Sequence, residues 1–285
     1  MESIPIVIFA YNRPSHFKRV TIALQNNKIK NKIYLILDGP RNKKEKIIQE
    51  DILGSIQIVG KFNKFKKKQI ILIRNKKNLG LARSILNGLD KISKLHSSFI
   101  VLEDDTIPYN NLIKFFERCL KKYSKEKQIA AICGYQFMNF DKNSKSLKTK
   151  FLKHFIPWGW ATWSKEWKNY RSNGEIIKNI NSKKVPYFIR KIQRTILKNN
   201  KKKKYWSLNF MMHNYIIDKY FIYPNLPLVK NIGFDGSGTN CAITNQLNVH
   251  EKKIEKTVLT NFSLNKKDLN KHEKQLKKVI KNFYN

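Results

Sequence analysis

Phe99-Ile100-Val101-Leu102-Glu103-Asp104-Asp105 places three acidic residues directly after a run of four apolar ones. A short apolar run predicts a strand buried on both faces, so the acids should stand where that strand ends. Adjacent carboxylates repel one another, and a bound cation would relieve the repulsion. Mg²⁺-like ions take one or two carboxylates and complete their shell with substrate phosphates and water. The alternative is that these acids cap the helix expected after Pro108.

Apolar runs and helical patterns alternate on both sides of this segment. Strands are predicted at 4–10, 33–37, 70–73, 99–102 and 129–133, and helices at 14–25, 44–59, 79–92 and 111–122. In the first helix Phe17, Val20 and Leu24 share one face. The alternation predicts an α/β fold with a mostly parallel sheet flanked by helices.

The pattern changes after about residue 140. Residues 151–167 are rich in Trp and carry few strand signals, and residues 221–231 look like a strand broken by two prolines. Helical patterns cover 176–198, 205–220 and 263–283, with the Lys run 201–204 between the first two. The last of these helices is basic and amphipathic. Its apolar residues, Leu269, Leu276, Ile280 and Phe283, could pack on the rest of the chain, or the helix could lie on an anionic membrane.

The chain is strongly basic, with a formal net charge of +38 over 285 residues. Only nine of its 58 basic residues are Arg, the residue that recognises phosphate with a bidentate fork. Two interpretations stay open: a compositional bias toward Lys, or attraction to an anionic membrane, glycan or lipid-linked phosphate. Nucleic acid is not expected as a partner, because zinc-finger spacing and RNP-like aromatic motifs are absent and Lys is spread along the whole chain.

The cysteines and the apolar segments predict a cytoplasmic protein. Three cysteines stand far apart and never as Cys-x-x-Cys, which argues against a disulfide framework or a cysteine zinc site. The first residues lack the basic segment of a secretory signal, and no apolar run approaches the roughly 20 residues that span a bilayer. G-x-G-x-x-G after the first strand and the P-loop pattern are also absent, which argues against dinucleotide and P-loop enzymes.

Ligands of open parallel sheets bind beyond the carboxyl ends of the strands. The segments that follow the first four predicted strands are therefore informative. They are Tyr11-Asn12-Arg13, Asp38-Gly39, Asn75 to Gly80, and Glu103-Asp104-Asp105. A phosphate and metal site could be assembled from these segments alone.

Six motifs follow one another along the chain: Phe-Ala-Tyr-Asn-Arg-Pro (9–14), Asp-Gly-Pro (38–40), Asn-Leu-Gly-Leu-Ala-Arg-Ser (78–84), Val-Leu-Glu-Asp-Asp (101–105), Trp-Gly-Trp-Ala-Thr-Trp (158–163) and Asn-Ile-Gly-Phe-Asp-Gly-Ser-Gly-Thr-Asn (231–240). In this order they resemble bacterial GT-A fold glycosyltransferases akin to family 2, with a Glu-Asp-Asp site like that of N-acetylglucosaminyltransferase I. The resemblance covers roughly residues 4–241. It implies a GT-A (Rossmann-like) sheet with a helical acceptor-side region and a C-terminal helix.

The resemblance also implies an activity, that of a metal-dependent hexosyl- or N-acetylhexosaminyltransferase. The donor would be a nucleotide sugar, with UDP the expected nucleotide. The acceptor would be a glycan or lipid-linked molecule of surface polysaccharide synthesis, such as lipopolysaccharide or capsule. Asp105 would be the ligand of Mn²⁺ or Mg²⁺. The residues implied to bind the donor are Ala10, Tyr11, Arg13, Asp38, Asn78, Arg83, Glu103 and Asp104.

Trp158, Gly159 and Trp160 are implied to form the floor of the acceptor site, since aromatic faces suit sugar rings. Core packing is the equal alternative, and it is favoured for Trp163.

The proton acceptor is implied less directly. In N-acetylglucosaminyltransferase I an Asp lies in a Trp-rich helix, and the comparable residues 205–209 contain no acid. Asp235 is the substitute candidate for the catalytic base and Glu166 is the second. For Asp235 the alternative is a turn residue beside glycines.

The expected organisation is a catalytic domain over residues 1–245 and a basic helical extension over 246–285. The catalytic domain would have a nucleotide-sugar half at 1–140 and an acceptor half at 141–245. Peripheral contact with the inner face of the cytoplasmic membrane is a further expectation. Two other functions stay open: an inactive sugar- or nucleotide-binding relative and, against the motif evidence, a basic nucleic-acid-binding protein.

Overall fold

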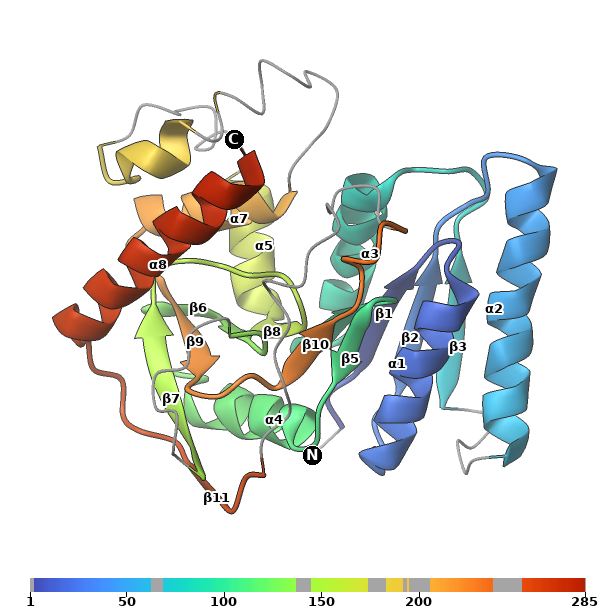
Figure 1. Cartoon of the computed structure of the whole chain (residues 1–285), viewed down its shortest axis with the longest axis horizontal. Helices are drawn as coiled ribbons and strands as arrows, with labels where there is room; N and C mark the ends of the chain where they lie inside the picture. The colour runs from blue at the N-terminus through green and yellow to red at the C-terminus, as the bar shows by residue number, and fades with distance from the viewer. Residues whose placement is uncertain are drawn as a thin grey trace.

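The structure is a computed structural model, and it describes residues 3–62, 69–136, 145–173, 183–191, 194, 206–237 and 253–284. A nine-stranded mixed sheet flanked by helices forms the body of the molecule (Figure 1). Its strands are ordered β11-β7-β9-β6-β8-β4-β1-β2-β3. The predicted α/β fold with a large, mostly parallel sheet is therefore confirmed.

Four parallel strands form the N-terminal half of the sheet: β1 (Ile6–Ala10), β2 (Ile33–Leu37), β3 (Ile70–Arg74) and β4 (Ser98–Glu103). They lie in the order β3-β2-β1-β4, and Ile6 pairs with both Ile33 and Ile100. β1, β2 and nearly all of β4 are buried. Burial on both faces explains why these sequences are continuous apolar runs rather than alternating ones.

The helices predicted after each of these strands are all present: α1 (Pro14–Asn26), α2 (Lys43–Phe62), α3 (Leu81–Leu95) and α4 (Leu112–Lys122). Pro14 occupies the first turn of α1, where its missing N–H costs nothing. Phe17, Val20 and Leu24 are buried, as predicted. Gly88 lets α3 approach the sheet closely, because a Cβ there would lie 2.5 Å from a side-chain carbon of β2.

The C-terminal half of the sheet contains β6 (Ile129–Cys133), β7 (Ser146–Leu152), β8 (Trp160–Trp163), β9 (Tyr220–Pro224) and β11 (Lys256–Val258). Its helices are α5 (Ser164–Ser172), α7 (Trp206–Ile216) and α8 (Lys266–Tyr284). β8 is antiparallel to its neighbours β4 and β6 and joins the two halves into one sheet. Residues 151–167 carry few strand signals, yet they contain β8, which is buried along its whole length and shows no alternating pattern.

A separate two-stranded ribbon pairs β5 (Thr106–Pro108) with β10 (Val229–Asn231). The acidic residues after β4 lead directly into β5, and Thr106 lies opposite Asn231. The ribbon therefore brings the segment after β10 beside the acidic residues, although the two are far apart in the sequence.

The first part of α8 packs on the C-terminal half of the sheet. Lys150 in β7 forms a 2.7 Å ion pair with Asp268, and His272 is almost fully buried. These contacts favour packing on the domain for this part of the helix. Outside the described part lie the side chains of Leu276, Ile280 and Phe283, and the Lys run 201–204. The predicted boundary between the two halves of the catalytic domain, at residue 140, and the predicted end of that domain, at residue 245, stay predictions. One sheet contains strands from both sides of residue 140.

Among the helices that the structure describes, none combines the length and the apolar character needed to cross a bilayer.

Candidate active site

The carboxyl ends of β1, β2, β3 and β4 lie at one edge of the sheet, as the sequence predicted (Figure 1). The segments that follow these strands are therefore neighbours. Backbone hydrogen bonds join three of them: Asp38 N donates to Ala10 O at 3.1 Å, and Asn75 N donates to Leu37 O at 2.9 Å. The first four sequence motifs thus meet in one place.

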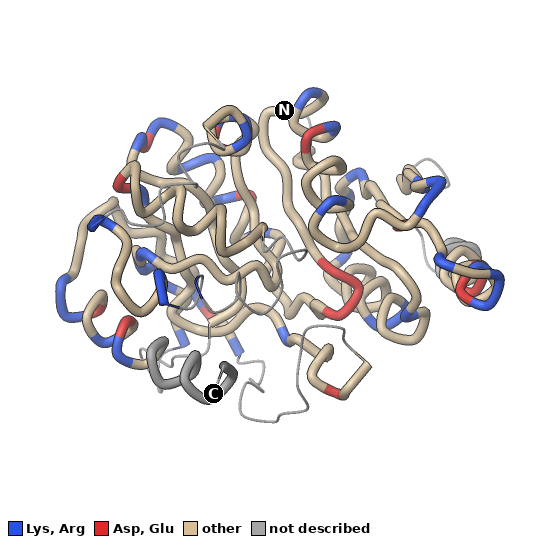
Figure 2. Tube along the Cα trace, turned by 90° about the horizontal axis from the view of Figure 1, so that it is seen from above, with Lys and Arg blue, Asp and Glu red and all other residues tan. Residues whose placement is uncertain are grey.

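Glu103, Asp104 and Asp105, here called the acidic turn, form a turn at the end of β4 and make the longest acidic stretch of the chain (Figure 2). Thr106 shapes the turn, because its hydroxyl donates to Glu103 O at 2.9 Å and accepts from Glu103 N at 2.8 Å. The next helix, α4, begins only after β5, and its first turn contains no acidic residue. The helix-capping interpretation of these acids is therefore wrong.

Arg13 is the cation of the acidic turn. Its guanidinium contacts the carboxylates of Asp104 and Asp105, with 2.9 Å between Nη2 and Asp105 Oδ2. Burial and the neighbouring carboxylates raise the pKa of Glu103. Burial also raises the pKa of Asp104, and Arg13 opposes this rise. One Arg beside the two carboxylates of Asp104 and Asp105 leaves the turn with an excess of negative charge.

The acidic turn fits a divalent cation that is shared with a substrate. Across the described residues, no three His, Cys, Asp or Glu side chains are grouped as a complete metal site. Two carboxylates are nevertheless what Mg²⁺ or Mn²⁺ takes from a protein when a phosphate supplies further oxygen ligands. Gly233 lets the Asp105 carboxylate lie against the backbone of the segment after β10, because an added Cβ would overlap Asp105 Oδ2. The chemistry of the turn therefore suits Asp105 as a metal ligand.

A second polar cluster holds Tyr11 beside the acidic turn. The Tyr11 hydroxyl donates to Glu45 in the first turn of α2, and Glu45 also accepts from Arg41 Nη2 at 2.6 Å. The hydrogen bond from Arg41 lowers the pKa of Glu45 to about 2, and burial raises the pKa of Tyr11 to about 12. Tyr11 is therefore a neutral side chain held in one orientation by an ionised carboxylate.

Asp38 organises the loop after β3 instead of facing outward. Its carboxylate accepts hydrogen bonds from Leu79 N at 3.0 Å and Gly80 N at 2.9 Å. Asn75 Nδ2 donates a further hydrogen bond of 3.1 Å. Asp38 is 5% exposed, and both of its oxygens are in use. Asp38 therefore positions this loop, and its predicted approach to a base or ribose stays a prediction.

Asn78 and Arg83 flank that loop. Asn78 Nδ2 donates to Gly39 O at 2.9 Å and so ties the loops after β2 and β3 together. Gly39 is needed for this approach, because an added Cβ would overlap the backbone of Lys77. Arg83 is exposed in the first turn of α3, at the same edge of the sheet.

The segment after β10 returns the chain to the acidic turn. Ile232 N donates to Asp105 O at 2.9 Å. Asp235 follows, and its Oδ2 lies 3.0 Å from His16 Nε2 in α1. Ser237 donates to Asp235 Oδ1 from its hydroxyl at 2.6 Å, and these hydrogen bonds lower the pKa of Asp235. Asp235 is therefore an ionised, half-exposed carboxylate beside the acidic turn.

Glu166 lies at the other edge of the sheet. It is in the first turn of α5, which follows β8, and β8 runs antiparallel to β4 with Trp163 opposite Ser98. Glu166 is therefore near the amino end of β4, whereas the acidic turn is at the carboxyl end. Its buried carboxylate is paired with Lys219. The prediction of Glu166 as a catalytic base is corrected to a structural ion pair.

Two of the predicted tryptophans belong to the core. Trp160 is fully buried and stacks on Trp206 with 5.6 Å between ring centroids, so it offers no face to an acceptor. Its predicted place in the acceptor floor is corrected to core packing. Trp163 is also buried, and its Nε1 donates to Leu120 O at 3.1 Å. Core packing of Trp163 is confirmed.

Trp158 and Gly159 remain beside the site. Trp158 is partly exposed and packs edge-on against Phe234, the neighbour of Asp235, with 5.2 Å between ring centroids. Gly159 has a φ of 67°, a left-handed conformation that strains other residues. The segment can therefore turn into β8 while Trp158 stays near the acidic turn.

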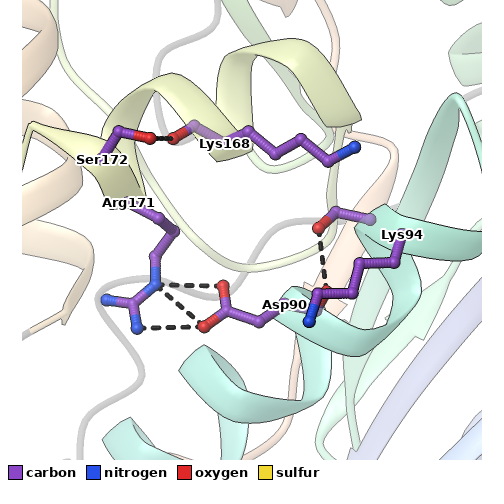
Figure 3. Close-up of a pocket in the computed structure, with 6 residues that line it drawn as sticks. Asp90, Lys94, Lys168, Arg171 and Ser172 are labelled. Atoms are coloured by element: carbon purple, nitrogen blue, oxygen red, sulfur yellow. Dashed lines mark hydrogen bonds and ion pairs between the residues drawn. The ribbon is translucent and has the colours of Figure 1, made fainter.

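A groove of about 310 Å³ lies between α3 and α5, and no residue of the acidic turn lines it (Figure 3). Arg171 Nη2 and Asp90 Oδ2 lie 3.0 Å apart in it, and Trp167 Nε1 donates to Asp90 Oδ1 at 2.8 Å. The other lining residues are Ser93, Lys94, Lys168 and Ser172. We interpret this groove as the packing junction of the two helices.

Four residues at the carboxyl edge were not predicted: His16, Arg41, Glu45 and Thr106. Glu45 has one local signal, since Asn42 and Glu45 have the spacing of a capping box, and Glu45 N donates to Asn42 Oδ1 at 2.9 Å. That pattern marks the start of a helix and not a site. His16 has no local signal, because its partner Asp235 is distant in the sequence. Arg41 pairs with Glu45 four residues later, but its contact with Tyr11 joins distant segments.

Comparison with known proteins identifies the family of the chain. Residues 6–199 match the family described as Glycosyl transferase family 2. A search of curated proteins found no similar sequence.

Similar solved structures include the glycosyltransferase GlyE from Streptococcus pneumoniae TIGR4, at 12% identity and a TM-score of 0.42 over 78% of this chain. The chain spans 45% of GlyE. The galactosyltransferase LgtC in complex with donor and acceptor sugar analogs is 8% identical, with a TM-score of 0.39 over 74% of this chain and 70% of that one. UDP-glucose pyrophosphorylase complexed with UDP-glucose is 11% identical, with a TM-score of 0.41 over 78% of this chain and 89% of that one.

Proposed function

Because the chain belongs to glycosyl transferase family 2, we propose that it transfers a hexosyl or N-acetylhexosaminyl group from a UDP-sugar to a hydroxyl group. The proposed acceptor is a glycan or lipid-linked molecule of surface polysaccharide synthesis, such as lipopolysaccharide or capsule. The observation that carries the proposal is the buried acidic turn with Arg13 at the carboxyl edge of the sheet. Open parallel sheets bind their ligands at this edge.

The diphosphate of the donor would bind between Arg13 and the first turn of α3. The guanidinium of Arg13 suits phosphate oxygens, and Arg83 adds a positive charge at the same edge. Tyr11 and Asn78 would shape the pocket for the nucleoside, because both are held by hydrogen bonds to neighbouring loops. Asp38 would act indirectly by fixing the loop after β3.

Mn²⁺ or Mg²⁺ held by Asp105 would supply positive charge to the departing diphosphate. Among the groups of the chain itself, Arg13 would stabilise the same charge, since its guanidinium is already in place before the reaction. Asp104 would keep Arg13 oriented through their ion pair.

Asp235 is the proposed proton acceptor. The O–H bond of the acceptor hydroxyl breaks, and its proton passes to Asp235 Oδ2. The acceptor oxygen bonds to the anomeric carbon, and the bond from that carbon to the diphosphate breaks with its electron pair leaving on the diphosphate. His16 Nε2, 3.0 Å from Oδ2, would hold the carboxylate in position.

Trp158 is the proposed acceptor contact. Its ring is partly exposed and packs against Phe234, next to Asp235. A sugar ring stacked on Trp158 would therefore present a hydroxyl close to the proposed proton acceptor.

A cytoplasmic location with peripheral binding to the anionic inner face of the membrane is part of the proposal. Lys and Arg are distributed over many elements of the molecule (Figure 2), and each Lys near such a surface contributes about 1 kcal/mol. Sedimentation with phosphatidylserine vesicles tests this point on the full chain and on a chain lacking residues 263–285. Equal binding by both chains would show that α8 does not anchor the protein to the membrane.

The competing candidate is an inactive relative that binds the donor without using it, and the absence of an acid at 205–209 favours it. Turnover separates the two. Release of nucleotide from a panel of nucleotide sugars, in Mn²⁺ and in EDTA, is the measurement. We expect release from one donor in Mn²⁺ only. Tight binding without release in the presence of varied glycan acceptors would support the inactive relative.

A further inference from the structure

Arg13 is a counter-ion built into the acidic turn. Its guanidinium contacts Asp104 and Asp105 together, and the three side chains are 18%, 4% and 11% exposed. The backbone of Arg13 is fixed between β1 and Pro14, and its carbonyl accepts a 3.0 Å hydrogen bond from Phe17 N. The junction of strand and helix therefore fixes the backbone from which the guanidinium extends.

The same oxygen of Asp105 contacts Arg13 and lies against the backbone of Gly233. Arg13 Nη2 lies 2.9 Å from Asp105 Oδ2, and a Cβ on Gly233 would overlap that oxygen. A divalent cation on Asp105 would therefore stand close to the guanidinium in a place with little water. Two like charges repel strongly there, because little solvent screens them. Arg13 and the cation consequently compete for Asp105.

We propose that Arg13 is an exchangeable counter-ion that couples the binding of a divalent cation to the binding of the diphosphate. Without a donor, the guanidinium holds Asp105 and disfavours the cation. With a donor, the diphosphate takes the guanidinium and leaves Asp105 to the cation. The inference rests on the proposed function, which assigns both ligands to this site.

Arginine suits this exchange because carboxylate and phosphate accept the same forked pair of hydrogen bonds. The excess of carboxylates also fits it, since Asp104 and Asp105 still attract a cation after Arg13 has turned to the diphosphate. The coupling is reciprocal: the cation must raise the affinity for the nucleotide by the factor by which the nucleotide raises the affinity for the cation.

The experiment measures Mn²⁺ binding from the electron paramagnetic resonance signal of the free ion, with and without UDP, corrected for the Mn²⁺–UDP complex. The proteins are wild type, Arg13→Gln and Arg74→Gln. Arg74 ends β3, which two strands separate from β4 in the sheet, and it forms a 3.1 Å ion pair with Glu50, so its replacement is a matched control for the lost charge. Arg13→Lys keeps the positive charge but lacks the forked pair of donors. It replaces Arg13→Gln in the experiment if circular dichroism shows that Arg13→Gln does not fold.

In wild type and Arg74→Gln, UDP should raise the affinity for Mn²⁺ by about tenfold or more, within the usual range of coupling. Arg13→Gln should bind Mn²⁺ alone about tenfold more tightly than wild type and lose most of the coupling. Arg13→Lys should fall between them. Mn²⁺ affinity in the Arg13 variants no higher than in wild type would overturn the exchange.

Failure of the proposed function would look different. In that case none of the proteins binds UDP at any Mn²⁺ concentration. The nucleotide-free titrations still decide about Arg13, because the competition for Asp105 needs no nucleotide.

Discussion

Two arginine–aspartate contacts in this molecule use the same groups in different surroundings. Arg171 and Asp90 join α5 to α3 through a forked pair, and about a third of each side chain is exposed (Figure 3). Arg13 joins the start of α1 to the turn after β4 and is mostly buried with its partners Asp104 and Asp105. The first contact is balanced in charge, whereas the second leaves acidic groups in excess.

The difference separates a structural contact from a candidate site. An exposed, balanced pair adds little to stability and serves here to join two helices. A buried cluster with unbalanced charge is costly to fold, so its presence points to a ligand that supplies the missing positive charge. The same substitution should therefore change activity and stability more at the acidic turn than at the contact of Arg171 with Asp90.

The largest expected difference is in activity. Asp105→Asn keeps the shape of the side chain and removes its charge, so we expect donor turnover to fall by about 10³-fold, as on losing a group that stabilises transition-state charge. Asp90→Asn should change turnover by less than about twofold. Steady-state rates of nucleotide release measure both variants. Equal losses would contradict the distinction between the two contacts.

The next difference is in stability. Arg13→Gln leaves two buried carboxylates without their counter-ion and should lower the free energy of unfolding by about 3 kcal/mol. Arg171→Gln should lower it by less than about 1 kcal/mol, because water already screens Asp90. Urea denaturation followed by Trp fluorescence gives both values. Mn²⁺ should restore part of the lost unfolding free energy in Arg13→Gln and none of it in Arg171→Gln. Equal losses in the two variants without Mn²⁺ would show that the buried carboxylates of the acidic turn do not need a counter-ion.

A smaller effect on activity is expected for substitutions of His16, which lies one turn after Arg13 in α1. His16→Leu removes the contact with Asp235 Oδ2, and His16→Gln can keep a nitrogen donor near it. We expect kcat of His16→Leu to fall about tenfold, the value of one hydrogen bond, with KM for the donor unchanged. His16→Gln should recover most of the rate. Wild-type kcat in His16→Leu would exclude a positioning role.

The smallest expected effect concerns a buried group outside both contacts. His213 in α7 is 1% exposed, and burial lowers the pKa of its imidazole to about 4. An unfolded His has a pKa of about 6.5, so between pH 6.5 and 4 the unfolded chain binds a proton that the folded chain does not. This contribution is complete above pH 6.5 and is lost as the pH falls toward 4.

Wild type should therefore lose about 1 kcal/mol of unfolding free energy between pH 6.5 and 5.5 relative to His213→Phe. Urea denaturation at the two pH values measures the difference. Parallel losses in the two proteins would show that His213 is not held neutral in the folded state.

The parallel half of the sheet could be predicted because its elements carry local signals. Residues 33–37 form an uninterrupted apolar run that became β2 without a change of limits, and Pro14 marks the first turn of α1. The rule that ligands gather at the carboxyl ends of parallel strands then places Arg13 beside the acidic turn.

The other half depends on contacts that no local pattern records. Trp160 and Trp163 lie in a strand buried on both faces, and its antiparallel direction carries Glu166 to the far edge of the sheet. The contact of His16 with Asp235 joins α1 to the segment after β10. Such pairings follow from topology, and the spacing of residues along the chain does not reveal them.

The most direct measurement of the central claim is isothermal titration of UDP, GDP, CMP and dTDP, in Mn²⁺ and in EDTA, into three proteins. These are wild type, Asp105→Ala and the matched control Asp90→Ala. We predict that one nucleotide binds wild type in Mn²⁺ only, and that this binding is lost in Asp105→Ala and retained in Asp90→Ala. Binding of no nucleotide under either condition, or undiminished binding by Asp105→Ala, would contradict a cation-dependent nucleotide site at the acidic turn.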